Sequence, residues 1–143
     1  MADTFLLEIV TPYRKLLSKE VEEVTAPGEI GEFGVLASHT QFLAILKAGE
    51  VTYKKGSESG TFAVGRGYAE VLPDKTTILV DNAETAEEIS AEDARAIIAK
   101  SEDAFKTMSP EDAEYAATVD AYELAQVRLR VKEKGRSGGG HGH

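Results

Sequence analysis

The amino-acid composition changes near residue 85, and this change predicts a β-rich part followed by a helical part. Before residue 85, β-forming residues and turn residues dominate, whereas alanines and charged residues dominate after it. The 143 residues suffice for one domain of moderate size or for two small units. We therefore predict a β-sandwich domain over residues 1–85, a helical hairpin over 86–134 and a disordered Gly/His tail over 135–143.

The first part consists of short segments with β alternation, separated by turn residues. The segment "TFLLEIV" ends before Pro12, and "KLLSKEVEEVTAP" continues the pattern as far as Pro27. One hairpin is expected to have its loop at residues 56–60, and another to turn at Pro73 and Asp74. Strands this short, with no helical pattern between them, are typical of a sandwich or flattened barrel. With the helices that follow, the expected fold class is α+β.

The second part carries two helical patterns. Ser90 is a good N-cap, and Asp93, three residues later, suits a capping box. A new cap at Ser109 begins the second helix, and Gly135 is expected to end it. Together the patterns predict an antiparallel two-helix hairpin.

Each helix has one narrow apolar stripe that is rich in alanine. The first stripe comprises Ala94, Ile97, Ile98, Phe105 and Met108, and the second comprises Ala113, Ala117, Ala121, Leu124, Val127 and Val131. Because such stripes bury little surface, we expect the hairpin to pack against the β-domain or against a partner.

The charge balance limits the partners. A net charge of −9 repels phosphate backbones and anionic lipids, so we expect neither nucleic-acid binding nor direct lipid binding. The N-terminal "MADTFLLEIVTPYRK" lacks the pattern of a signal peptide, and no apolar run approaches the length of a membrane helix. The chain is therefore expected in the cytosol, or beside a membrane through a partner.

No catalytic or metal site is predicted. "GEIGEFG" lacks the Lys-Ser/Thr ending of a phosphate loop, and "GRG" lacks the third glycine of a dinucleotide fingerprint. Only one histidine precedes the tail, so a multi-histidine metal site cannot form there, and no nucleophile with an orienting partner is evident. An enzyme using Glu29, Glu32 and His39 is the weaker alternative. The stretch "PGEIGEFGVLASHTQFLAIL" is better explained as an exposed docking turn followed by a buried strand, "FLAIL".

Two long stretches resemble a known family. "APGEIGEFGVLASHTQFLAILKAGEV" and "VGRGYAEVLPDKTTILVDNAE" are similar to the epsilon subunit of bacterial F-type ATP synthase. The resemblance extends over nearly the whole chain, from "LLEIVTP" to "VRLRVKEK". It implies a ten-stranded β-sandwich followed by a two-helix C-terminal hairpin.

The resemblance also implies a function. Members of the family are non-catalytic rotor subunits of the central stalk, which bind the gamma subunit and the ring of c subunits. They couple ion translocation to ATP synthesis and in many bacteria restrain ATP hydrolysis. The implied location is peripheral, on the cytoplasmic face of the bacterial inner membrane. The alternative is a free-standing nucleotide-sensing module that acts through its hairpin.

The family's docking edge corresponds to the turn from Glu32 to His39. The resemblance implies that Glu32, Phe33 and His39 dock on the c-ring and on the base of gamma, with Glu32 meeting basic residues of the c-subunit loops. The alternative is that Glu32 is merely solvated and that His39 fills the turn.

The resemblance extends in part to an ATP-binding motif. In "AEDARA" Glu92 stands for the motif's aspartate, while Arg95 and Ala96 match it, and Arg128 matches one arginine of the second helix. Leu124 replaces the other arginine and cannot bind phosphate. We therefore expect no cofactor, and ATP at most as a weak regulatory ligand. Ordinary surface salt bridges, such as Arg95 with Glu92, are the alternative.

A basic end on the second helix is the last candidate site. It comprises Arg128, Arg130, Lys132 and Lys134. When the hairpin extends, these cations are expected to meet acidic residues of the catalytic alpha/beta head and to act as a brake. Alternatively, they only stabilise the dipole of their own helix.

Overall fold

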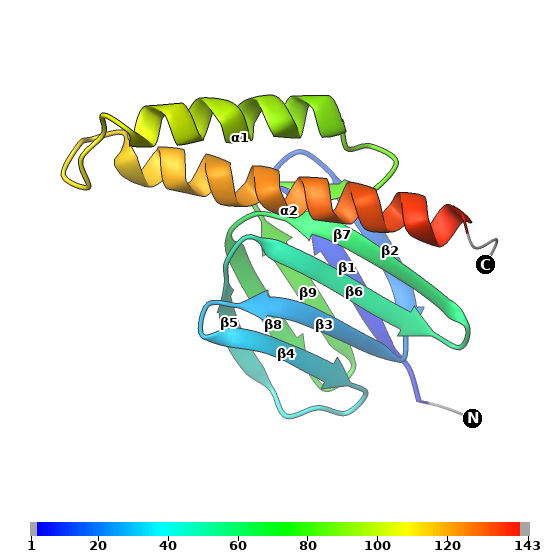
Figure 1. Cartoon of the computed structure of the whole chain (residues 1–143). Helices are drawn as coiled ribbons and strands as arrows, with labels where there is room; N and C mark the ends of the chain where they lie inside the picture. Colours follow the sequence, from blue (N-terminus) through cyan, green and yellow to red (C-terminus); the bar gives the residue numbers. More distant parts are fainter. Residues whose placement is uncertain (1–2, 141–143) are drawn as a thin grey trace.

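The structure, a computed structural model that describes residues 3–140, consists of ten strands followed by two helices (Figure 1). This confirms the predicted α+β class and the order of its two parts. The strands are β1 (Phe5–Val10), β2 (Lys15–Val21), β3 (Glu23–Gly28), β4 (Gly31–Leu36), β5 (Phe42–Leu46), β6 (Gly49–Lys55), β7 (Glu58–Val64), β8 (Gly67–Leu72), β9 (Lys75–Val80) and β10 (Ala83–Thr85). The helices are α1 (Ala91–Phe105) and α2 (Tyr115–Gly140).

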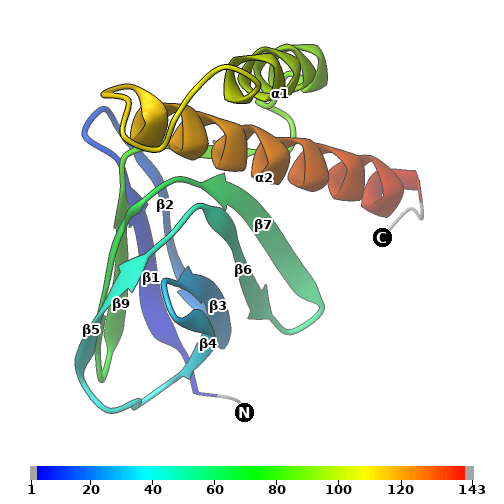
Figure 2. The same ribbon diagram turned by 60° about the vertical axis from the view of Figure 1, so that its left-hand side comes forward.

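The strands form one continuous sheet that folds over into two layers (Figure 2). The strand order is β10-β7-β6-β3-β5-β8-β9-β1-β2, and β4 pairs with the free side of β3. One layer passes into the other between β3 and β5, which share the single pair Gly28 and Leu46. All pairs are antiparallel except β1 with β9. The α2 helix lies across β6 and β7.

The core lies between the layers, and alternation along each strand selects its side chains. In β1, Phe5, Leu7 and Ile9 are buried. The prediction that "FLAIL" is a buried strand was wrong, because β5 buries only the face that carries Leu46. Its other face leaves large apolar side chains exposed.

The two predicted hairpins form, and one has a shorter loop than expected. The turn between β8 and β9 falls at Pro73 and Asp74, as predicted. Only Gly56 and Ser57 join β6 to β7, so the expected loop over residues 56–60 was wrong. Gly60 instead pairs with Tyr53, where a Cβ atom would lie 2.4 Å from the tyrosine ring. This glycine therefore permits close packing rather than a turn.

The α1 helix begins as predicted. The Ser90 hydroxyl accepts a hydrogen bond of 3.1 Å from the backbone N–H of Asp93 and caps the helix. The predicted stripe packs towards α2: Ala94 is buried, and Ile97, Ile98 and Phe105 are half-buried.

The α2 helix begins later than predicted. Ser109 does not cap it, because the Ser109 N–H donates to the Asp112 carboxylate and the Asp112 N–H donates back to the Ser109 carbonyl. These bonds close a separate turn before Tyr115. The predicted stripe is correct only in its second half. Ala113, Ala117 and Ala121 are exposed, whereas Leu124 is half-buried and Val127 and Val131 are buried.

Gly135 does not end α2, so that prediction was wrong. The helix continues to Gly140, which places the first residues of the predicted tail in a helix, while residues 141–143 lie outside the described part. A Cβ atom at Gly135 would lie 2.5 Å from the Cβ of Ala86. Gly135 therefore allows α2 to approach the segment after β10 closely. In the part of the chain that the structure describes, no helix is long and apolar enough to cross a membrane.

Candidate docking and regulatory surfaces

The predicted docking edge is built from β4 and the turn that follows it. Glu32 and Phe33 are neighbours in β4 and therefore point to opposite faces. Glu32 is exposed, at the rim of a polar pocket of about 420 Å³. Phe33 is half-buried and packs against the core. Of this pair, only Glu32 presents its side chain freely to a partner.

His39 and Phe33 are linked through Phe42. The ring of Phe42 makes an edge contact with Phe33 at 5.5 Å between centroids and another with His39 at 5.3 Å. His39 Nδ1–H donates to the Thr40 carbonyl at 2.9 Å. The preceding residue, Ser38, has a φ of 63°. These contacts fix the turn that follows β4 and leave His39 half-buried.

A group of exposed apolar side chains was missed by the sequence analysis. It lies on the outward side of three neighbouring strands, where β8 pairs with both β5 and β9. Its members are Leu43 (68% exposed), Ile45 (53%), Tyr68 (52%) and Leu79 (45%), which we call the apolar outer face. Ile45, Tyr68 and Leu79 stand in one row across the strands. The signal was present in "FLAIL", where both alternating faces are apolar although one side of the sheet meets solvent.

The helical hairpin packs on the sandwich through a second, small apolar cluster. It joins Ala63 of β7 and Ile89 of the linker to Val127 and Val131 of α2. This cluster is separate from the main core, so the hairpin is held by few apolar side chains. The expectation that the hairpin packs against the β-domain is confirmed.

Arg128 is the most buried cation of the basic end. Its side chain is 13% exposed, and its guanidinium lies 2.6 Å from the Glu84 carboxylate and 3.1 Å from that of Asp93. Burial disfavours the charge, but hydrogen bonds to Glu84 and Asp93 outweigh it and raise the pKa of Arg128 above its usual value. Arg128 therefore ties β10, α1 and α2 together.

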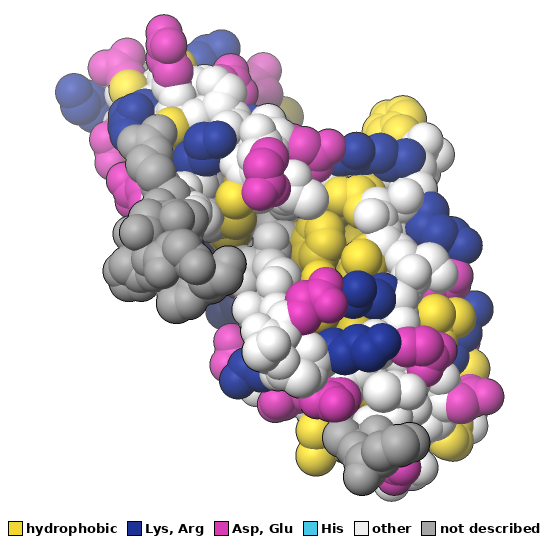
Figure 3. Space-filling view, turned by 90° about the vertical axis from the view of Figure 1, so that its right-hand side faces the viewer, with side chains coloured by type: hydrophobic (Ala, Val, Ile, Leu, Met, Phe, Trp, Pro, Cys, Tyr) yellow, Lys and Arg dark blue, Asp and Glu magenta, His cyan; other side chains and the backbone are white. Residues whose placement is uncertain are grey.

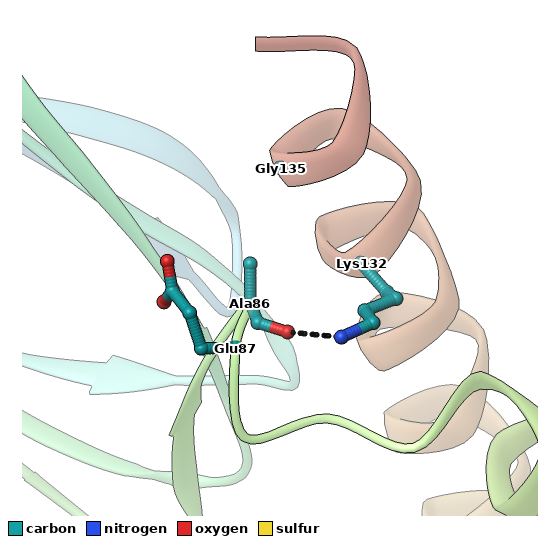
Figure 4. A pocket seen from close by; sticks show the side chains of 4 residues that line it. All are labelled: Ala86, Glu87, Lys132 and Gly135. Atoms are coloured by element: carbon teal, nitrogen blue, oxygen red, sulfur yellow. Dashed lines mark hydrogen bonds between the residues drawn. The ribbon is translucent and has the colours of Figure 1, made fainter. Parts of the chain in front are cut away.

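The other three cations of the basic end also contact the sandwich or the linker. Lys134 and Arg130 both bind the Glu50 carboxylate, at 2.6 Å and 3.4 Å. Lys132 Nζ donates to the Ala86 carbonyl at 2.9 Å, beside Gly135 (Figure 4). In this conformation all four cations of the basic end bind groups of the same chain.

The linker to the hairpin is anchored to the sandwich by an ion pair. The Arg14 guanidinium lies 2.7 Å from the Glu88 carboxylate, which also accepts the backbone N–H of Thr85. The hydrogen bond from Arg14, followed by that from Thr85, lowers the pKa of Glu88 to about 2. These contacts attach the linker to the sandwich as far as Glu88, just before α1 begins.

The residues of the partial nucleotide motif are not gathered into one site. Glu92, Arg95 and Ala96 are exposed on α1. The acid that faces Arg128 is Asp93, not Glu92. Within residues 3–140, no ion pair joins Arg95 to Glu92, and no group of three or more His, Cys, Asp or Glu side chains is arranged to hold a metal ion.

Charged side chains of both signs are interspersed on the face of the molecule in Figure 3. There, Lys, Arg, Asp and Glu side chains surround an apolar area near the centre of the view. Because charges of both signs are interspersed, the binding of a partner to this surface depends on individual charged side chains and not on one uniform potential.

Known proteins resemble both parts of the chain. Residues 4–86 match the family model described as the ATP synthase, Delta/Epsilon chain, beta-sandwich domain. The ATP synthase epsilon chain of Geobacter metallireducens is 48% identical over 134 residues, which cover 94% of this chain and 97% of the relative. The chain belongs to the ATP synthase epsilon-chain family. The epsilon chain of Geobacter sulfurreducens is 47% identical over the same shares.

Solved structures agree on the fold of this epsilon-family chain. A chain of the mitochondrial ATP synthase of Euglena gracilis, from its OSCP/F1/c-ring structure, superposes with a TM-score of 0.75 at 23% identity, over 89% of this chain and 79% of its own. A chain of the Tetrahymena thermophila central stalk and c-ring structure gives a TM-score of 0.57 at 20% identity, over 94% and 97%. As a member of the epsilon family, the protein is a non-catalytic rotor subunit of ATP synthase.

Proposed function

We propose that this epsilon-family chain docks on the gamma subunit and the c-ring through its sandwich, and that its hairpin restrains ATP hydrolysis when the basic end leaves the sandwich. Its place would be peripheral, on the cytoplasmic face of the bacterial inner membrane. The relatives' names and the solved assemblies support a role in the rotor, and the surfaces described above would make these contacts.

The apolar outer face is the best candidate surface for gamma. Its four large side chains are each at least 45% exposed, and together they form one patch on a rigid sheet. Such a patch favours a permanent partner, because leaving it in water is unfavourable by about 25 cal/mol per Å².

The exposed end of β4 is the candidate contact for the c-ring. Glu32 is exposed beside Ile30, which is fully exposed at the tip of the β3–β4 turn. An acid next to an apolar side chain suits a polar loop that carries a cation. The Phe33–Phe42–His39 row holds this edge in place from the core side.

The regulatory proposal rests on one observation: all four cations of the basic end bind the sandwich, the linker or α1. In the packed state these cations are therefore occupied. Release of α2 would free them for acidic residues of the catalytic alpha/beta head. The small apolar cluster, the largely shielded Arg128–Glu84 pair and several more exposed ion pairs, including Arg66–Asp120, oppose that release.

ATP hydrolysis by a catalytic head that contains gamma tests the proposal. The full chain is compared with a chain that ends after Glu88, which keeps β10 and the Arg14–Glu88 ion pair. We expect both to bind and only the full chain to suppress hydrolysis. If both bind and neither suppresses, the regulatory role is refuted and the docking role stands. If the full chain fails to bind gamma, the docking role is refuted.

Weak ATP binding is a second candidate function. Arg128 offers a guanidinium at the position of a family arginine, but Glu84 and Asp93 already occupy it. A nucleotide would have to displace two carboxylates, so we propose an affinity weaker than about 1 mM, the level at which binding contributes about 4 kcal/mol. Calorimetric titration of MgATP into the full chain measures it, and the Arg128→Gln variant serves as the comparison.

A further inference from the structure

The turn between the helices carries an apolar groove that is separate from the docking and regulatory surfaces described above. In Figure 1 this end of the hairpin extends beyond the sandwich. The groove has a volume of about 370 Å³. Its walls come from the end of α1, the connecting turn and the first half of α2, and they include Phe105, Met108, Tyr115, Val119, Tyr122 and Gln126.

Three aromatic rings form one wall of the groove. Phe105 meets Tyr122 edge-on, with 5.5 Å between centroids, and lies 6.0 Å from Tyr115. The Tyr122 hydroxyl donates to the Glu102 carboxylate at 3.3 Å. All three rings are half-buried, so part of each remains open to a ligand. Such rings can pack against aliphatic side chains and against the stems and charges of lysine or arginine.

Acidic side chains near the groove favour a positively charged ligand. Residues 102–123 carry seven carboxylates and one lysine. Glu123 lines the groove directly, and Glu102 stands at the Tyr122 hydroxyl. Asp103 is paired with Lys106, and Asp120 with Arg66. Among the residues that the structure describes, no ion pair involves Glu102 or Glu123, and the cations of the basic end bind Glu84, Asp93 and Glu50 instead.

We propose that this groove is a docking site for a basic amphipathic helix of a partner protein. The helix would place apolar side chains between the aromatic rings and set lysines or arginines against Glu102 and Glu123. Apolar contact supplies the binding free energy, and the acidic rim supplies orientation and selection against acidic segments.

Titration of a synthetic Leu/Lys/Arg helix into the full chain tests the proposal, with a Leu/Glu helix of equal length as the control peptide. We expect saturable binding of the basic helix, with amide shifts in the NMR spectrum concentrated between Phe105 and Gln126. The double variant Glu102→Gln/Glu123→Gln should weaken binding by about fivefold to tenfold. Met108→Ser should weaken it as well, because it removes an apolar wall.

The matched control is Glu70→Gln/Glu133→Gln, which removes the same number of charges from exposed residues of β8 and α2 away from the groove. We expect it to leave affinity within about twofold. An equal loss in this control, equal binding of the acidic helix, or no saturable binding would each overturn the proposal. Concentration-dependent dimerisation with the same amide shifts would also overturn it, since the occupant would then be a second copy of this chain.

Discussion

Glu50 is the point at which two cations of α2 meet the sandwich. It stands at the start of β6 and binds both Lys134 and Arg130. Its own side chain is largely shielded, whereas both cations are more than half exposed. Solvent therefore weakens each pair, so this contact would oppose the proposed release of α2 only weakly.

We expect Glu50→Gln to loosen the end of α2 without unfolding the sandwich. Two exposed ion pairs would be lost, at about 0.5–1 kcal/mol together. Hydrogen exchange of α2 amides near Arg130 should accelerate by about twofold to fivefold. Glu70→Gln, an exposed acid of β8, is the control. Equal acceleration in both variants would mean that general charge, not Glu50, holds the helix.

The Arg14–Glu88 ion pair makes stability depend on pH. The pKa of Glu88 is about 2 in the folded chain and 4.5 in the reference state. Its charged form therefore stabilises the fold above about pH 4.5, and this contribution disappears as the pH falls through about 2. Both side chains are over one-third exposed, so solvent screening limits the contribution to about 1 kcal/mol.

Urea unfolding of the wild type and of Glu88→Gln measures this contribution. We expect the wild type to be more stable by about 1 kcal/mol at neutral pH, with the difference shrinking towards zero as the pH approaches about 2. A difference that does not vary with pH would show that the glutamate acts by packing and not by charge.

At the scale of elements, α2 divides into two halves with different neighbours. The first half, which includes Val119 and Tyr122, faces α1, whereas Val127 and Val131 reach β7 and the linker. The apolar signal of α2 is correspondingly divided, and this is why the predicted stripe failed over Ala113 to Ala121. A pattern that switches partners along one helix cannot be assigned from periodicity alone.

Val131→Ala should loosen the hairpin from the sandwich. Removal of two buried methyl groups is expected to weaken the contact by about 1.5 kcal/mol, at about 0.8 kcal/mol for each group. Hydrogen exchange should rise in the second half of α2 and remain slow in β1 and β9. Val119→Ala, the same change in the half that faces α1, is the control and should not affect the contact with β7.

Gly135→Ala should have opposite effects on the helix and on its packing. Alanine favours a helix by about 1 kcal/mol over glycine, so circular dichroism should show α2 unchanged or strengthened. The new Cβ would lie 2.5 Å from that of Ala86, so the end of α2 must move away from the linker. Adding Ala86→Gly should restore the contact, as measured by hydrogen exchange. Failure of this rescue would contradict the close-approach explanation.

At the scale of the whole molecule, the candidate docking surfaces lie on the sandwich and the candidate regulatory cations lie on the hairpin. The sandwich has a continuous core and carries an apolar outer face on one layer, while α2 of the hairpin lies across β6 and β7. In the proposed function, this separation would let the apolar outer face stay bound to a partner while the hairpin moves.

Tyr68→Ser should weaken binding to gamma and leave the fold intact. Tyr68 stands in the middle of the row between Ile45 and Leu79, so the change removes the centre of the patch. We expect about a tenfold loss of affinity in a binding titration with the isolated gamma subunit. Tyr13→Ser is the matched control, because Tyr13 is 90% exposed and lies outside the apolar outer face. An equal loss in both variants would argue against this surface.

The sequence alone determined the features that depend on neighbouring residues. The order of sandwich and hairpin, the Pro73–Asp74 turn and the Ser90 cap follow from alternation, turn chemistry and capping, which act over a few residues. The family could also be identified, because its motifs are contiguous.

Only the tertiary structure decided the features that join residues far apart in the chain. Strand pairing determined that Leu43 and Ile45 face solvent, and it aligned them with Tyr68 and Leu79. The packing of α2 brought Lys134 to Glu50 and gave Gly135 a role in close contact, although a glycine after a basic stretch favours a helix end. The physical reason is that burial and ion pairing depend on contacts between residues far apart in the chain, and short stretches of sequence do not specify these contacts.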